Sequence, residues 1–207
     1  MITRADIPKE VLHVADTLEN RGFEAYLVGG CVRDLVLEHE PHDWDITTNA
    51  NPLEIESLFP ETYANNVYGT VGVVTESDNP RLKVVEVTPY RTESEYSDAR
   101  RPDKVEFGVS LEEDLKRRDF TVNALAYRPK TGELVDLYGG QEDITKKLIK
   151  AVGDPSERFG EDALRMMRGV RLAVRLGFTI EGDTMTAIAE NAENLARISK
   201  ERIRDEF

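Results

Sequence analysis

A pair of adjacent glycines among closely spaced charges constrains this chain most. The segment "YLVGGCVRDLVLEHEPHDWDIT" (26–47) places Gly29 and Gly30 between an apolar run and a helical pattern. Two glycines permit a tight turn and a close approach of backbone to a ligand, and the helix start behind them offers free N–H groups to an anion. Arg33, one turn into that helix, can add a charge-assisted contact. Taken alone, the pattern favours an ordinary strand-to-helix turn, in which Arg33 and Asp34 pair with neighbours.

Two carboxylates follow the turn at a spacing of two. Asp43 and Asp45 belong to "DWDIT" (43–47), a predicted strand, and a period of two puts both acids on one face. Such a pair suits Mg²⁺, which prefers a few carboxylates, water and substrate phosphates. By itself the pair is more often two solvated acids at a strand end. Glu86, the only acid in "LKVVEVT" (82–88), is either a third member of this cluster or a surface residue of a sheet edge.

The remaining patterns predict an α/β domain over residues 1–150 and an all-helical domain over residues 151–207. A polar stretch without periodicity, 91–103, is predicted to be a long mobile loop. The other elements expected in the first domain are helices over about 8–20, 30–37 and 52–59 and strands over 24–28, 69–75 and 81–90, the last two forming an antiparallel hairpin.

A basic cluster precedes an apolar segment in "LKRRDFTVNALAY" (115–127). Arg118 and its basic neighbours stand next to Asp119, beside what we expect to be a buried helix. A positive group in that position can contact a phosphate. The alternative is a solvated helix end.

The segment "GEDALRMMRGVRLAVRLGF" (160–178) has four arginines at helical spacing. They fall on one side of the predicted helix, and the four are Arg165, Arg168, Arg171 and Arg175. The opposite, apolar side is expected to be core and consists of Met166, Met167, Val170, Ala173 and Val174. Like charges repel, so an anionic partner explains the arginine side better than solvent does.

Asp162 precedes Arg165 by three residues, so the two side chains can lie together. A carboxylate beside a guanidinium matches the amino donor and ring-nitrogen acceptor of cytosine and adenine, and it mismatches uracil and guanine. The alternative is that Asp162 only orients Arg165 or caps the helix start.

Net charge and cysteine content limit how the chain can contact RNA and in which compartment we expect it. The chain has 27 Lys and Arg against 40 Asp and Glu, a net charge of −13, so any RNA must be met through local basic patches. Cys31 is the single cysteine, which excludes an internal disulfide and fits a cytoplasmic location. No apolar run approaches the roughly 20 residues of a membrane span.

Taken together, four segments resemble the class II tRNA nucleotidyltransferase and bacterial poly(A) polymerase family, which contains the CCA-adding enzymes. The resemblance runs in order from about Tyr26 to the end. Its motifs are "LVGGCVRDLVL" with "DWDIT", "RRDFTVNALA", "LVDLYGGQEDITKKLIKAV" and "EDALRMMRGVRLAVRLGF", and "RTESEYSDARRP" is similar to the family's flexible loop.

The resemblance implies a head domain with a mixed, largely antiparallel sheet (1–150) and an all-α neck (151–207). It implies template-independent addition of CMP and AMP to the 3′ end of tRNA from CTP and ATP, with Mg²⁺ at the acid pair. The implied site residues fall into a catalytic group and a nucleotide-binding group. They are Asp43, Asp45 and Asp119 for catalysis, with the metal at Asp43 and Asp45, and Gly30, Arg33, Arg118, Asp162, Arg165, Arg168 and Arg171 for the nucleotide.

The chain departs from the family pattern in two places. Glu38 stands where the family commonly has glycine after "DLVL", so that turn is expected to be shaped differently. The chain also stops at "ISKERIRDEF", where the family continues through further helical domains, which puts its grip on tRNA in doubt. Two other functions stay open: A-only or poly(A) addition, and a catalytically inactive RNA-binding module.

Overall fold

The computed structural model describes residues 2–64, 68–94 and 104–206, and these form two compact units. The sequence-based boundary at residue 150 stays a prediction. The first unit consists of Met1–Thr92, Glu106–Leu115 and Leu125–Leu137, and the second of Glu93–Val105, Lys116–Ala124 and Tyr138–Phe207.

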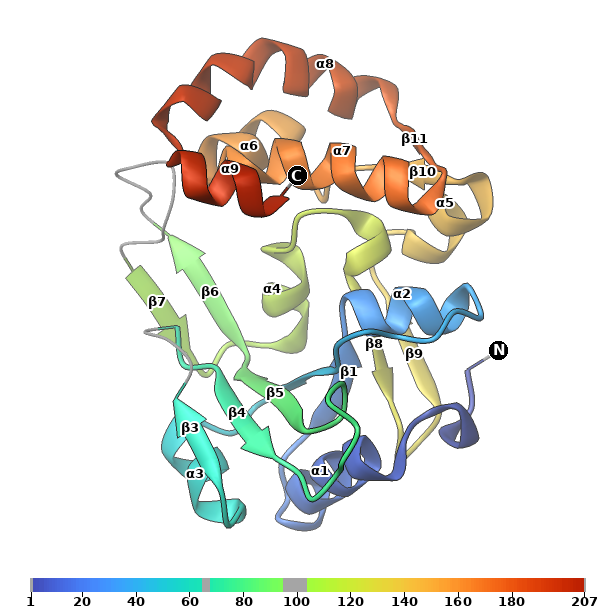
Figure 1. The fold of residues 1–207 in the computed structure, drawn as a ribbon, viewed down its shortest axis with the longest axis vertical. Coiled ribbons are helices and arrows are strands. Elements are labelled where there is room, and N and C mark those ends of the chain that lie inside the picture. The colour runs from blue at the N-terminus through green and yellow to red at the C-terminus, as the bar shows by residue number, and fades with distance from the viewer. Residues whose placement is uncertain (1, 65–67, 95–103, 207) are drawn as a thin grey trace. The chain divides into compact units, whose positions relative to one another are not determined.

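The first unit is built on a seven-stranded sheet in the order β3-β4-β5-β2-β1-β8-β9 (Figure 1). Neighbouring β2 and β5 run parallel, and the other neighbours run antiparallel. The expected mixed, largely antiparallel sheet is therefore confirmed. Its strands are β1 (Ala25–Val28), β2 (Asp45–Thr48), β3 (Thr62–Ala64), β4 (Val71–Val74), β5 (Val84–Pro89), β8 (Leu125–Arg128) and β9 (Glu133–Asp136).

Helices of the first unit form where period and capping predict them. The apolar face of α1 buries Val11, Val14 and Leu18 against the sheet, and α1 and α3 contact each other. Asn51 caps α3: its side chain accepts from the Glu54 N–H at 3.0 Å, and the Glu54 carboxylate accepts from the Asn51 N–H at 2.7 Å. The helices are η1 (Arg4–Asp6), α1 (Lys9–Asn20), α2 (Gly30–Val36), α3 (Pro52–Leu58) and α4 (Leu111–Lys116), of which Lys116 falls in the second unit.

Three sequence-based boundaries were wrong. The strand predicted over 43–47 begins only at Asp45. The predicted loop 91–103 begins with a strand, β6 (Arg91–Ser94), which forms a two-stranded sheet with β7 (Lys104–Phe107); residues 95–103 lie outside the described residues. The segment 115–127 is not a buried helix, because α4 ends at Lys116 and the chain continues through a short turn of helix into β8.

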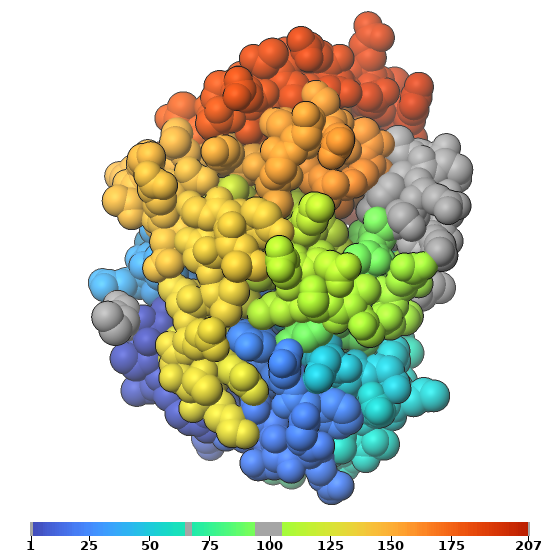
Figure 2. Space-filling view, turned by 180° about the vertical axis from the view of Figure 1, so that it is seen from behind, coloured from blue at the N-terminus to red at the C-terminus, as the bar shows by residue number. Residues whose placement is uncertain are grey.

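The second unit is mainly helical. Helix α8 packs against α6, and in the space-filling view the red C-terminal residues lie against the orange helices of the same unit (Figure 2). The prediction of an all-helical domain over residues 151–207 missed β11, which pairs in parallel with β10. Its elements are η2 (Thr121–Asn123), α5 (Gly140–Lys146), β10 (Leu148–Ile149), α6 (Pro155–Glu161), α7 (Leu164–Leu176), β11 (Thr179–Ile180), α8 (Gly182–Asn191), η3 (Ala192–Arg197) and α9 (Lys200–Glu206).

Helix α7 buries only part of the side that was predicted to be core: Met166 is buried as expected, but two valines are not. Val170 and Val174, expected in the core, are 46% and 79% exposed. Gly169 and Leu172 are buried instead, and a side chain at Gly169 would lie 2.8 Å from the ring of Phe120. The missing side chain lets Phe120 approach the helix backbone, so this side of α7 faces the ring. No helix within the described ranges is long and apolar enough to cross a bilayer.

Candidate active site

The glycine pair forms a tight turn at the end of β1. Gly29 has a φ of +78°, a left-handed value that favours glycine, and precedes the first residue of α2. The guanidinium of Arg33 folds back over Gly30, with Nη2 3.5 Å from where a Gly30 side chain would begin. A side chain at Gly30 would be in ordinary van der Waals contact with this guanidinium, so Arg33 lies directly above the turn.

Arg33 is held in place by its neighbour. Its Nε and Nη2 donate to Oδ1 of Asp34 at 2.9 and 2.7 Å, and the two residues are only 4% and 6% exposed. This confirms the pairing that the sequence offered as the ordinary alternative. The pairing does not exclude a phosphate contact, because a guanidinium has five N–H donors.

The turn that follows α2 has a left-handed backbone conformation at a residue that is not glycine. Glu38 has a φ of +58°, in the left-handed region that non-glycine residues seldom adopt. The expectation that this turn is shaped differently from the family's stays a prediction.

The acid pair lies at the start of β2. Asp43 precedes the strand in a bend and is exposed, Trp44 is buried, and Asp45 is half-buried. This alternation is expected when both acids leave the chain on the side opposite Trp44. Glu86 is the register partner of Asp45 on the parallel strand β5, and its N–H donates to the Trp44 carbonyl at 3.1 Å.

The glycine turn and the acid pair occupy the same edge of the sheet. Strands β1 and β2 are antiparallel with Leu27 opposite Ile46, so the end of β1 lies beside the start of β2. The thiol of Cys31 connects them, with Sγ 3.3 Å from the Val28 carbonyl oxygen and 3.8 Å from that of Asp45. Burial raises the pKa of this thiol to about 12, so it stays protonated and can donate.

The donors at this edge fit a hard divalent cation. Asp43, Asp45 and Glu86 offer carboxylate oxygens, the ligands that Mg²⁺ prefers. Within residues 2–64, 68–94 and 104–206, no three His, Cys, Asp or Glu side chains are already grouped closely enough to hold a metal. Mg²⁺ commonly takes only one or two protein carboxylates and completes its shell with water and phosphates.

Asp119 belongs to the second unit and is buried there. Its Oδ2 accepts from Nη1 of Arg168 at 3.0 Å, and its Oδ1 accepts from the Phe120 N–H at 2.8 Å and from Asn123 Nδ2 at 3.3 Å. Burial alone would raise its pKa, but the charges of Arg168 and Arg165 outweigh burial and hold the pKa of Asp119 below its usual range. Asp119 therefore positions Arg168 as an ionised partner.

The three residues of the basic cluster, Lys116, Arg117 and Arg118, have different surroundings. Arg117 donates to Glu93 at 3.0 Å, and Lys116 is exposed at the end of α4. Arg118 is half-buried between α4 and η2. In the sequence, Arg118 directly precedes the buried Asp119.

Asp162 lies in the break between α6 and α7, so it caps the second helix. Its Oδ1 accepts from the Leu164 N–H at 3.0 Å, and its Oδ2 accepts from Nη2 of Arg202 at 3.2 Å. Arg165 is buried and donates to Glu161 at 2.9 Å. The side-chain pair of Asp162 and Arg165 that the spacing allowed is absent from the ion pairs of the described residues.

The later arginines of α7 meet α9. Glu206 lies 3.5 Å from Nε of Arg168 and 3.0 Å from Nη1 of Arg171. Neither Glu206 nor Arg202 was identified from the sequence. The signal that could have found them is their spacing of four, which puts both charges on one face of α9.

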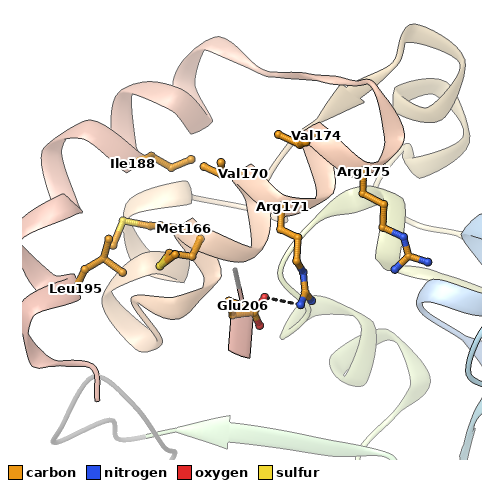
Figure 3. Close-up of a pocket in the computed structure, with 9 residues that line it drawn as sticks. Met166, Val170, Arg171, Val174, Arg175, Ile188, Leu195 and Glu206 are labelled. Carbon is orange, nitrogen blue, oxygen red and sulfur yellow. Dashed lines mark ion pairs between the residues drawn. The ribbon is translucent and has the colours of Figure 1, made fainter. Parts of the chain in front are cut away.

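An apolar pocket of about 390 Å³ lies beside these ion pairs (Figure 3). The Arg171–Glu206 pair borders it. The exposed apolar face of α7 forms one wall, and the apolar lining residues are Met166, Met167, Val170, Val174, Ile188 and Leu195.

Two family models match segments that together cover most of the chain. A family model described as "Poly A polymerase head domain" matches residues 25–150, more than half of the chain. The chain belongs to the poly(A) polymerase head-domain family. A second model, "Probable RNA and SrmB- binding site of polymerase A", matches residues 177–207.

Members of the family with high identity carry the name CCA-adding enzyme. The chain is 51% identical over 203 residues to the CCA-adding enzyme of Lactobacillus helveticus, covering 98% of this chain and 49% of that protein. It is 53% identical over 200 residues to that of Enterococcus faecalis, covering 96% and 48%. The chain thus spans about half the length of these relatives.

Solved structures of the family show the same fold. The Bacillus stearothermophilus CCA-adding enzyme in complex with CTP superimposes with a TM-score of 0.85 at 44% identity, covering 96% of this chain and 47% of that one. The Thermotoga maritima CCA-adding enzyme complexed with tRNA-CCA gives a TM-score of 0.77 at 25% identity, covering 97% and 47%.

Proposed function

We propose that the chain carries the catalytic part of a CCA-adding enzyme, which adds CMP and AMP to the 3′ end of tRNA from CTP and ATP. Support comes from about 50% identity to CCA-adding enzymes over nearly the whole chain. It also comes from the match to a relative solved with CTP. We assign this activity to the cytoplasm.

The observation that carries the proposal is the shared edge of the glycine turn and the acid pair. A triphosphate needs N–H donors and positive charge, which the start of α2 and Arg33 supply. The same phosphates need a cation held by carboxylates, which Asp43 and Asp45 supply with Glu86 beside them. These two requirements are met at adjacent strand ends, because β1 and β2 pair antiparallel.

The acids of this edge would hold Mg²⁺. When bound, the cation neutralises developing charge on the phosphates and makes the attacking 3′-hydroxyl easier to deprotonate. Asp43 and Asp45 contribute the negative charge that retains it, and Arg33 orients the phosphate oxygens. Arg118 is the further phosphate contact that we assign to the second unit.

Base choice is assigned to the second unit. Asp162 accepts from the exocyclic amino group of cytosine or adenine, and Arg165 donates to the adjacent ring nitrogen. Arg168 and Arg171 hold positive charge nearby on α7, and Asp119 positions Arg168. No nucleic-acid template is needed when side chains read the base.

A sizing assay tests the proposal. tRNAs that end before the first C, after C and after CC are incubated with labelled CTP or ATP, and the products are sized. CCA addition predicts that the tRNA ending before the first C gains two CMP and the tRNA ending after C gains one CMP. Only the tRNA ending after CC gains an AMP, and it gains one. Growth of long A tracts would instead assign poly(A) addition, and use of ATP alone would assign A-only addition.

The assay also addresses the inactive RNA-binding module. Asp43→Asn is run in parallel as the metal-site control. Absence of incorporation by the unmodified chain, together with Mg²⁺-independent nucleotide binding, would contradict the proposal and favour the inactive module.

A further inference from the structure

Helix α9 carries two opposite charges that reach the proposed base-selecting residues. Arg202 and Glu206 are four residues apart and therefore share one face of the helix. None of the α9 residues is fully buried, and Ile203 is half-buried. Its ion pairs outside α9, within the part of the chain that the structure describes, go to Asp162, Arg168 and Arg171.

Arg202 fixes the carboxylate of Asp162. One oxygen of Asp162 caps α7 through the Leu164 N–H at 3.0 Å, and the other accepts from Arg202 Nη2 at 3.2 Å. With both oxygens engaged, the carboxylate cannot rotate freely. Each oxygen still has a second lone pair, so Asp162 remains able to accept from a ligand.

Among the described residues, the guanidinium of Arg202 forms an ion pair with Asp162 alone. Its Nη1 is buried and has no hydrogen-bond partner within residues 2–64, 68–94 and 104–206. This concentration on one carboxylate distinguishes Arg202 from a residue that joins several structural elements.

Glu206 holds the neighbouring arginines. Its two carboxylate oxygens lie 3.5 Å from Arg168 Nε and 3.0 Å from Arg171 Nη1, the second contact being the dashed line in Figure 3. Arg168 is held from its other side by Asp119. The carboxylate thereby offsets the mutual repulsion of two neighbouring guanidinium groups.

We propose that Arg202 is a specificity-determining positioning residue: it holds Asp162 in the orientation that reads the base, with Glu206 anchoring α9 to α7. This inference rests on the proposed function. An Asp162 that is free to rotate loses the fixed acceptor direction that separates an amino group from a carbonyl oxygen. Removing Arg202 therefore weakens the choice of cytosine and adenine over uracil and guanine more than it slows the reaction itself.

The test compares two arginines of one helix. Arg202→Met removes the contact to Asp162, and Arg204→Met removes the same charge from an exposed position that pairs only with Asp205 among the described residues. Single-nucleotide incorporation is measured with each of the four triphosphates on tRNAs ending before C and after CC. Thermal unfolding and far-UV circular dichroism of every variant establish that α7 and α9 are folded.

The expected result is a drop of about tenfold in the preference of Arg202→Met for CTP and ATP, within the ~5- to 150-fold range of a good base contact. Arg204→Met keeps the wild-type preference. Arg202→Lys, which restores a charge and a donor, recovers part of it. In an Asp162→Ala background, Arg202→Met changes the preference no further.

If the wild type selects CTP and ATP, and Arg202→Met and Arg204→Met show the same preference for these two nucleotides, this inference is overturned. The proposed function would still stand. A wild type that incorporates no nucleotide, or all four alike, would overturn both. If Arg202→Met does not fold, Arg202→Gln, which keeps one amide donor near the same length, takes its place under the same two criteria.

Discussion

Glu86 and Asp45 are register partners on the parallel strands β5 and β2. Side chains of register partners leave a sheet on the same face, so the glutamate adds negative charge next to the proposed metal ligand. Glu86→Gln keeps the shape and removes that charge. We expect the Mg²⁺ concentration for half-maximal nucleotide addition to rise by about tenfold, with kcat at saturating Mg²⁺ nearly unchanged. An unchanged Mg²⁺ dependence would return Glu86 to the role of a surface residue.

Asp45→Asn should have a larger effect on activity. It removes a charge from the metal site and preserves the volume and the hydrogen-bonding backbone of β2. We expect loss of nucleotide addition with an unaltered far-UV spectrum and melting temperature. Wild-type turnover by Asp45→Asn would make the metal assignment untenable.

Asp162→Ala should relax base choice and cost stability. The base contact is worth roughly 5- to 150-fold in discrimination, and the lost cap to the Leu164 N–H costs about 1 kcal/mol of helix stability. Asp162→Asn retains a capping oxygen, so it should spare stability and still impair discrimination. The four triphosphates are compared by single-nucleotide incorporation. A fixed ratio among them in both variants would leave Asp162 with the capping role alone.

Gly169→Ala should destabilise the second unit. The new methyl group would lie 2.8 Å from the Phe120 ring, and overpacking of a core costs about 1–3 kcal/mol. Gly160→Ala in α6 is the matched control, because nothing lies within 4 Å of that position and alanine favours a helix by up to about 1 kcal/mol. Urea unfolding should thus shift in opposite directions for the two variants. A neutral Gly169→Ala would refute the close approach of Phe120.

Acid should weaken the contact between Asp119 and Arg168. The pKa of Asp119 is lowered in the folded state because Arg168 and Arg165 outweigh burial. The contribution to stability is therefore complete above the unfolded-state pKa of about 4 and is lost as pH falls through the lower, folded-state value. Asp119→Asn should flatten the stability curve below about pH 4, whereas the exposed Asp183→Asn should not. Urea midpoints between pH 2.5 and 7 give the comparison.

Local rules predicted much of the fold. Apolar period and caps placed α1 and α3, and alternating β-branched residues placed the β4–β5 hairpin. These features depend on residues within a few positions of one another, which a sequence displays directly. The glycine turn, too, was evident from Gly29 and Gly30 alone.

Long-range contacts account for what the sequence did not reveal. The inward face of α7 includes Gly169, whose missing side chain admits a ring 49 positions earlier, at Phe120. Counting apolar residues cannot show such a contact, so Val170 and Val174 were misplaced. The ion pair of Asp162 likewise joins residues 40 apart, whereas spacing alone offered the nearer Arg165.

The alternation of exposure at the start of β2 has a spectroscopic consequence. Trp44 is the only tryptophan of the chain; it stands between the two acids in the sequence, and its side chain is buried in the core. Indole emission excited at the red edge therefore arises from one residue, which lies on the side of the chain opposite the two acids. The chain has its own optical probe of that strand, without any attached dye, and a signal from it reports on the catalytic edge rather than on an average over the molecule.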